Sequence, residues 1–199
     1  MKNTRIRDMK EYELQNYIKE IRKEIEQQLK MYVKLNNNKL SNNGQIQNLK
    51  KKAYNLKEIY EYIKWANDKI AINNNVGVSS RTIPKRGEIW TCQLGENIGS
   101  EENKIRPAII IQNDTGNEKG PTTIIVPISN RPKKISTHIE LRNSDYKLVH
   151  GEVNKITGTV LCEQIKVVSK ARLGRHVATL NNDFVNKILN SKLKISIKV

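Results

Sequence analysis

The stretch that decides the fold of the second half of this chain is GSEENKIRPAIIIQNDTGNEKGPTTIIVPIS, residues 99–129. It holds two short β-branched runs, at 108–111 and 122–128, and the segment between them is rich in the Asn, Asp and Gly residues that form turns. Short apolar runs bounded by turn residues favour strands over helix. The stretch therefore predicts a polar loop followed by two neighbouring antiparallel strands.

Two polar residues stand at the ends of these predicted strands. Arg106 lies where the loop enters the first strand, and Ser129 ends the second. Because an antiparallel pair brings the start of one strand beside the end of the other, we expect the guanidinium and the hydroxyl to lie close together. Loops beside rigid strands are a common position for functional residues.

The motifs around this stretch resemble, in order and spacing, the MazF/PemK family of toxin endoribonucleases. They are GSE at 99–101, RP at 106–107, QND at 112–114, PTT at 121–123, THIEL at 137–141 and EQI at 163–165. The resemblance covers residues 85–199. It implies an SH3-like, CcdB-type antiparallel β-barrel, a homodimer, a cognate antitoxin, and metal-independent cleavage of single-stranded RNA to 2′,3′-cyclic phosphate and 5′-hydroxyl ends.

The resemblance assigns catalytic roles to Arg106, Ser129 and Glu101. Arg106 would stabilise charge on the phosphate, because its planar fork matches two phosphate oxygens, and would be a candidate proton donor to the leaving oxygen. Ser129 stands where many family members have threonine and keeps the hydroxyl. Glu101 would accept the 2′-hydroxyl proton or orient Arg106. The alternative for Arg106 is an ion pair with Glu101 or Glu102 that only pins the loop.

Five further residues are candidates for RNA binding. Ser100, Asn103 and Lys104 lie in the loop that touches bases in the family, and Lys104 stands where relatives often have glycine or another small or polar residue. Gln164 resembles a glutamine that lines the RNA groove, where its amide can pair with base edges. The alternative is an ordinary polar residue on an exposed strand. His138 lies at a family motif position, and structural support is its alternative role.

The first 75 residues are of a different kind, with no proline and one glycine, Gly44. Apolar residues recur at a 4,3,4,3 spacing from Leu14 to Ile25 and again over 46–70, and a polar turn separates the two runs at 36–44. This spacing predicts an antiparallel helical hairpin with a coiled-coil-like seam over residues 1–75. Its role stays open between dimerisation, antitoxin docking, restriction of substrate access and an added basic surface for RNA.

Residues 76–84 have the composition of a linker, and residues 85–199 show the short strands of a small barrel. Candidate strands cover 88–94, 108–112, 122–128, 137–141, 158–168 and 176–179. A helix from about 181 to the end would place Phe184, Ile188 and Leu193 near one face. The predicted class is α+β, a helical hairpin followed by an antiparallel barrel with a C-terminal helix.

Composition limits the partners. Lysine and arginine number 36 against 20 acidic residues, a net charge of +16, which favours a polyanionic partner such as nucleic acid unless the source organism's proteins are simply lysine-rich. Cys92 and Cys162 have no metal-ligand spacing and make a poor disulfide framework, so we expect a reducing, cytoplasmic setting without metal or cofactor. No apolar run suits a membrane span or a signal peptide.

Two other functions remain possible at this stage. CcdB-type proteins of the same fold class poison gyrase by binding protein, because fold alone does not settle function. A catalytically weak RNA-binding regulator is the third possibility, and steep salt dependence without cleavage would indicate it.

Overall fold

The computed structural model describes residues 6, 9–37, 45–79, 82–130 and 135–198. Its contacts divide the chain into two units, Met1–Ile63 and Lys64–Val199. The division falls earlier than the boundary expected near residue 75. The segment expected as a linker begins with a short helix, α3 (Val76–Ser79).

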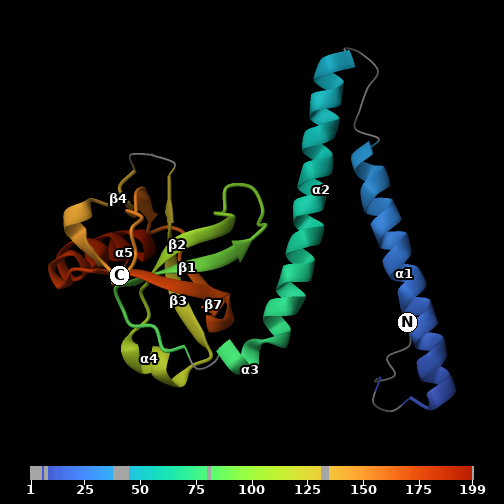
Figure 1. The fold of residues 1–199 in the computed structure, drawn as a ribbon, viewed down its shortest axis with the longest axis horizontal. Coiled ribbons are helices and arrows are strands. Elements are labelled where there is room, and N and C mark those ends of the chain that lie inside the picture. The colour runs from blue at the N-terminus through green and yellow to red at the C-terminus, as the bar shows by residue number, and fades with distance from the viewer. Residues whose placement is uncertain (1–5, 7–8, 38–44, 80–81, 131–134, 199) are drawn as a thin grey trace. The chain divides into compact units, whose positions relative to one another are not determined.

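The first unit contains α1 (Glu11–Asn37) and the first part of α2 (Gln45–Asn74), which Figure 1 shows in blue to green. Two helices on either side of a polar segment were predicted, and this prediction is confirmed. Several apolar positions of the predicted seam are exposed in the single chain, among them Ile18, Ile25 and Leu49, each of which is 50–66% exposed. Pairing along the seam therefore stays a prediction.

The second unit is built on a curled antiparallel sheet (Figure 1). The strands are β1 (Glu88–Gly95), β2 (Lys104–Ile110), β3 (Thr122–Ser129), β4 (His138–Glu140), β5 (Tyr146–Leu148), β6 (Thr159–Leu161), β7 (Lys166–Ser169) and β8 (Leu173–Leu180). Their order in the sheet is β4-β6-β3-β2-β1-β8-β5, and β7 also pairs with β3. The predicted barrel with a C-terminal helix is thus confirmed.

Side-chain alternation divides the apolar residues of β2 and β3 between two cores. Ile109, Val126 and Ile128 face the main core, which also receives the C-terminal helix. Ala108 and Ile110 face a smaller core with Cys92 and Leu94 of β1. Strands with both faces covered read as continuous β-branched runs, which explains the AIII and TTIIV sequences.

Several boundaries differ from the prediction. The run 158–168, expected as one strand, is two strands, because β3 pairs with β7 through Thr122–Ile125 and with β6 through Ile128–Ser129. The chain turns between them, and the Gln164 N–H donates to the Leu161 carbonyl (2.9 Å). In addition, β2 begins at Lys104 rather than Ala108, so Arg106 lies inside the strand. The sequence did not predict β5 or the short helix α4 (Asp114–Lys119).

The C-terminal helix corrects one predicted core residue. Its first part, Phe184–Leu189, is a π-helix, in which the Asn190 N–H donates to the Val185 carbonyl, and α5 (Asn190–Ile197) follows. The wider turn moves the buried position from Ile188, which is 42% exposed, to Leu189, which is fully buried. No helix among the residues described is long and apolar enough to cross a membrane.

Within the second unit, the end of α2 lies against the root of the β1–β2 loop. Gly95 has φ +85°, and a Cβ there would collide with the indole of Trp65. Arg172 stacks over the same indole, 5.2 Å from the ring centroid. Gly95 is therefore required both by its backbone conformation and by the close approach of Trp65.

Candidate active site

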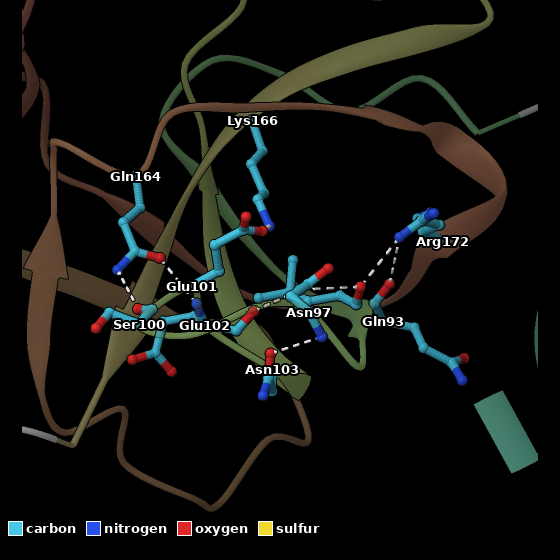
Figure 2. Close-up of polar contacts among 10 residues, drawn as sticks. Gln93, Asn97, Ser100, Glu101, Glu102, Asn103, Gln164, Lys166 and Arg172 are labelled. Carbon is cyan, nitrogen blue, oxygen red and sulfur yellow. Dashed lines mark hydrogen bonds and ion pairs between the residues drawn. The ribbon is translucent and has the colours of Figure 1, made fainter. Parts of the chain in front are cut away.

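The loop between β1 and β2 is held by hydrogen bonds to its own backbone (Figure 2). The Asn97 side chain donates to the Glu102 carbonyl (2.8 Å), and the Asn97 N–H donates to the side-chain oxygen of Asn103 (3.0 Å). The Gln164 amide accepts from the Glu102 N–H (2.9 Å) and donates to the Ser100 carbonyl (3.1 Å). A loop without regular structure is thereby fixed in one shape.

Two cations hold the sides of the same loop (Figure 2). Arg172 donates to the carbonyl of Leu94 (3.1 Å), where β1 ends. Lys166 of β7 pairs with Glu101 across 2.6 Å. Glu101 is about half exposed, so this carboxylate stays accessible to a ligand.

The residue that orients Arg106 is Glu102. Its carboxylate lies 3.2 Å from the Arg106 Nε, which also donates to the Asn103 carbonyl (3.0 Å). The Glu102 side chain is 7% exposed and that of Arg106 is 29% exposed. The sequence offered Glu101 and Glu102 as equal ion-pair partners, and the structure selects Glu102 because its backbone is clamped between Asn97 and Gln164.

Ser129 lies on the same face of the sheet as Arg106. The described ladder of β2 with β3 ends where Ala108 pairs with Pro127, and alternation along each strand puts Arg106 on the side of Ala108 and Ser129 on the side of Pro127. The hydroxyl is buried, and among the described residues it has no hydrogen-bond partner. Buried hydroxyls are nearly always paired, so a hydroxyl without a partner on the same face as a guanidinium indicates a site for a ligand.

Gly158 fixes the end of β3. It has φ +133°, and a Cβ there would lie 2.6 Å from the Ser129 carbonyl oxygen. Only glycine allows this backbone approach. The Gly158 carbonyl accepts from the Leu141 N–H (3.0 Å), which ties the β4 segment to the same point.

His138 of β4 contacts Glu163, the residue before Gln164 in the β6–β7 turn. His138 Nε2 lies 2.8 Å from Glu163, and the histidine side chain is 7% exposed. Burial acts to raise the pKa of Glu163, but hydrogen bonds from His138, from its own backbone and from Thr137 outweigh burial and lower it. The Gln164 amide is occupied by the loop, and Ser100 is exposed at the loop tip.

Lys104 has φ +68°, a left-handed conformation that costs an L-residue about 1–2 kcal/mol. Replacing it with glycine removes this strain. Glycine loses more backbone entropy on folding than lysine does, and this loss offsets part of the gain. We expect Lys104→Gly to raise the free energy of unfolding by about 0.5–1 kcal/mol in urea titration. Lys104→Ala removes the same amine without relieving the backbone, so equal stability of the two variants would contradict the prediction.

The clamp by Gln164 can be measured directly. In Gln164→Ala the Glu102 N–H loses its acceptor, and since such a bond contributes about 1 kcal/mol, we expect its amide hydrogen exchange to accelerate severalfold. Gln164→Glu keeps an acceptor and loses only the donor to Ser100, so protection at Glu102 should persist in this matched variant. Unchanged exchange in Gln164→Ala would show that the turn does not hold the loop.

The thiols take no part in this arrangement. Burial raises the pKa of Cys92 and of Cys162 to about 12. Both therefore remain protonated at neutral pH and are unsuited to nucleophilic catalysis. Over the described part of the chain, no group of His, Cys, Asp or Glu residues could hold a metal ion.

Comparison with known proteins covers the same part of the chain as the site. Residues 85–197 match the family described as PemK-like, MazF-like toxin of type II toxin-antitoxin system. Endoribonuclease MazF of Staphylococcus saprophyticus is 38% identical over 109 residues, which are 54% of this chain and 86% of that protein.

Solved structures that are similar include MazF from Deinococcus radiodurans. It is 18% identical, with a TM-score of 0.49 over 59% of this chain and 99% of that chain. A mycobacterial endoribonuclease in complex with its cognate antitoxin is 22% identical, with a TM-score of 0.47 over 58% of this chain and 96% of that chain.

Proposed function

Since this chain belongs to the PemK-like, MazF-like toxin family of type II toxin–antitoxin systems, we propose that it is an endoribonuclease toxin that cuts single-stranded RNA. The proposed reaction needs no metal, because the ribose supplies the nucleophile. The 2′-oxygen attacks the phosphorus and loses its proton, and the bond to the 5′-oxygen breaks as that oxygen gains a proton. The products are a 2′,3′-cyclic phosphate and a 5′-hydroxyl.

In this mechanism Arg106 binds the phosphate. Its guanidinium stabilises the charge that develops on the pentacovalent phosphorane, and preset donors of this kind usually make the largest single contribution. Glu102 holds the arginine in position through the 3.2 Å contact to Nε. Arginine is a poor proton donor because of its high pKa, so its role is electrostatic before it is acidic.

Ser129 and Glu101 complete the proposed catalytic set. The Ser129 hydroxyl, which lacks a partner among the described residues, is free to bond a phosphate oxygen or the 2′-hydroxyl. Glu101 is the carboxylate proposed to accept the 2′-proton, and it is half exposed next to Lys166. Ser100, Asn103 and Lys104 of the loop would contact the bases. Gln164 supports the loop from the β6–β7 turn, and His138 of β4 contacts Glu163 of that turn.

The proposed partners follow from the family. We expect a cognate antitoxin that covers the loop and a homodimer of this chain, acting on RNA in the cytoplasm. The high positive charge supports a polyanionic substrate, since the chain has 36 basic residues and 20 acidic ones.

One observation carries the proposal: a guanidinium anchored by a buried carboxylate lies on the same face as a buried hydroxyl without a partner. The test is incubation of the purified full chain with a long unstructured RNA in EDTA, followed by sequencing and chemical analysis of the ends. Discrete fragments with cyclic phosphate are expected. Fragments that require added Mg²⁺, or no fragments together with gyrase-linked DNA breaks in cells, would contradict it.

A further inference from the structure

A second feature of the barrel is a cavity of about 260 Å³ at the open end of the main core. Its lining includes the apolar residues Pro107, Ile128 and Val177. Asn130, which follows Ser129 at the end of β3, also lines the cavity. Arg106 borders the cavity, so a strand bound at this arginine can place an adjacent nucleotide in it.

The rim of the cavity carries an ion pair between Glu152 and Arg175, 3.0 Å apart. The Glu152 side chain is 8% exposed, whereas that of Arg175 is 72% exposed. Arg175 lies at a β-bulge, where the pairing of β1 with β8 shifts, and its backbone N–H donates to the Thr91 hydroxyl (2.8 Å). Bulges commonly re-aim a side chain next to a functional site, and here the bulge directs Arg175 toward Glu152.

The carboxylate of Glu152 is held as a fixed acceptor. The backbone N–H of Asn154 lowers the pKa of Glu152; burial opposes this effect, and Arg175 adds to it. An ionised carboxylate only accepts hydrogen bonds, so it discriminates between ligand edges that donate and edges that accept.

The size and charges of the cavity suit one nucleotide. Its volume is below the range of about 300–1,000 Å³ found for drug-sized ligands. Lys155 and Arg175 supply positive charge for a phosphate, and the apolar part of the lining suits the face of a base.

Resting on the proposed function, we infer that this cavity is a nucleobase subsite of the RNA track, in which Glu152 selects a base that presents an exocyclic amine. Cytosine and uracil make the sharpest comparison, because they share one ring and differ in an amine donor against a carbonyl acceptor. Uracil would place its carbonyl oxygen against the carboxylate and bind less tightly.

The test measures binding rather than cleavage. The affinities of the full-length protein for oligo-C and oligo-U, both 2′-O-methylated so that they cannot be cut, are determined by fluorescence anisotropy at one fixed salt concentration. Wild type should prefer oligo-C, and Glu152→Gln, whose amide also donates, should reduce the C-to-U affinity ratio by about tenfold. Circular dichroism checks that the variant folds.

Two variants serve as controls. Lys155→Ala removes a cation at the rim, so it should weaken the binding of both oligonucleotides equally and make the affinity depend less steeply on salt concentration. Lys147→Ala, on β5 and outside the cavity, should change neither the C-to-U affinity ratio nor the salt dependence. If Glu152→Gln does not fold, a Lys155→Ala protein that binds both oligonucleotides with wild-type salt dependence still overturns the inference.

The remaining outcomes separate the two proposals. Base discrimination that depends on Glu152 without cleavage in EDTA would support the subsite and contradict the nuclease. Cleavage with a C-to-U ratio unchanged in Glu152→Gln would overturn the subsite alone. Loss of antitoxin binding in Glu152→Gln with RNA binding intact would also overturn it, because the cavity would then hold peptide.

Discussion

Arg106→Ala is expected to lower the cleavage rate about 10³-fold, because it removes the donor that faces the charge developing on the phosphate. Arg106→Lys keeps the charge but not the planar fork, so a loss of about 10²-fold is expected. The rates are measured under single-turnover conditions on one RNA that carries a single cleavage site. Arg22→Ala, which removes an exposed arginine from α1, is the charge-matched control and should cleave at the wild-type rate.

Loss of the arginine also leaves Glu102 buried without its partner. Breaking a fully buried ion pair costs about 3–5 kcal/mol, and the cost here should be smaller because Arg106 is 29% exposed. The double variant Arg106→Ala with Glu102→Gln should therefore regain stability in urea titration without regaining activity. If Arg106→Ala cleaved as fast as Arg22→Ala, the arginine would serve only to fix the loop.

The central strands could be predicted from sequence because their signal is local. The β-branched runs around Ile109 and Val126 are short and bounded by turn residues, and antiparallel pairing then follows from the short connection. The expected approach of Arg106 to Ser129 needs only the rule that antiparallel strands meet start to end. The structure pairs Ala108 with Pro127, two residues from each of them, and their approach stays a prediction.

The choice between Glu101 and Glu102 could not be made from sequence. Both carboxylates stand next to each other in a polar loop, and what separates them is the contact of the Glu102 backbone with Gln164, 62 residues further along the chain. Gln164 itself was expected on a strand, because the run 158–168 is rich in apolar and β-branched residues on both sides of it. The turn at this residue exists because β3 takes two successive partners, which no local pattern reports.

The C-terminal helix illustrates a different limit. A period of 3.6 residues predicts Ile188 as the buried partner of Phe184, whereas the π-helical turn buries Leu189 five residues after Phe184. The wider turn is set by packing of the helix on the main core, to which Phe184, Val185 and Leu189 all belong. Helical periodicity found the element but not its register.

Ser129→Ala should separate stability from activity. The hydroxyl is buried and has no partner among the described residues, so replacing it with a methyl hydrogen removes an uncompensated polar group. Such a group costs about 1–3 kcal/mol, and we therefore expect the free energy of unfolding in urea to rise by about 1 kcal/mol or more. Because the same hydroxyl is proposed to bond the phosphate or the 2′-oxygen, cleavage should fall about 10²-fold.

Ser129→Thr provides the matched variant, since it keeps the hydroxyl and adds one methyl group in a fully buried position. It should retain activity within about tenfold and lose stability if the added methyl overpacks the strand end. A less stable Ser129→Ala would mean that the hydroxyl has a partner in the folded chain. A more stable but fully active Ser129→Ala would remove Ser129 from the catalytic set and leave Arg106 to carry the phosphate contact without it.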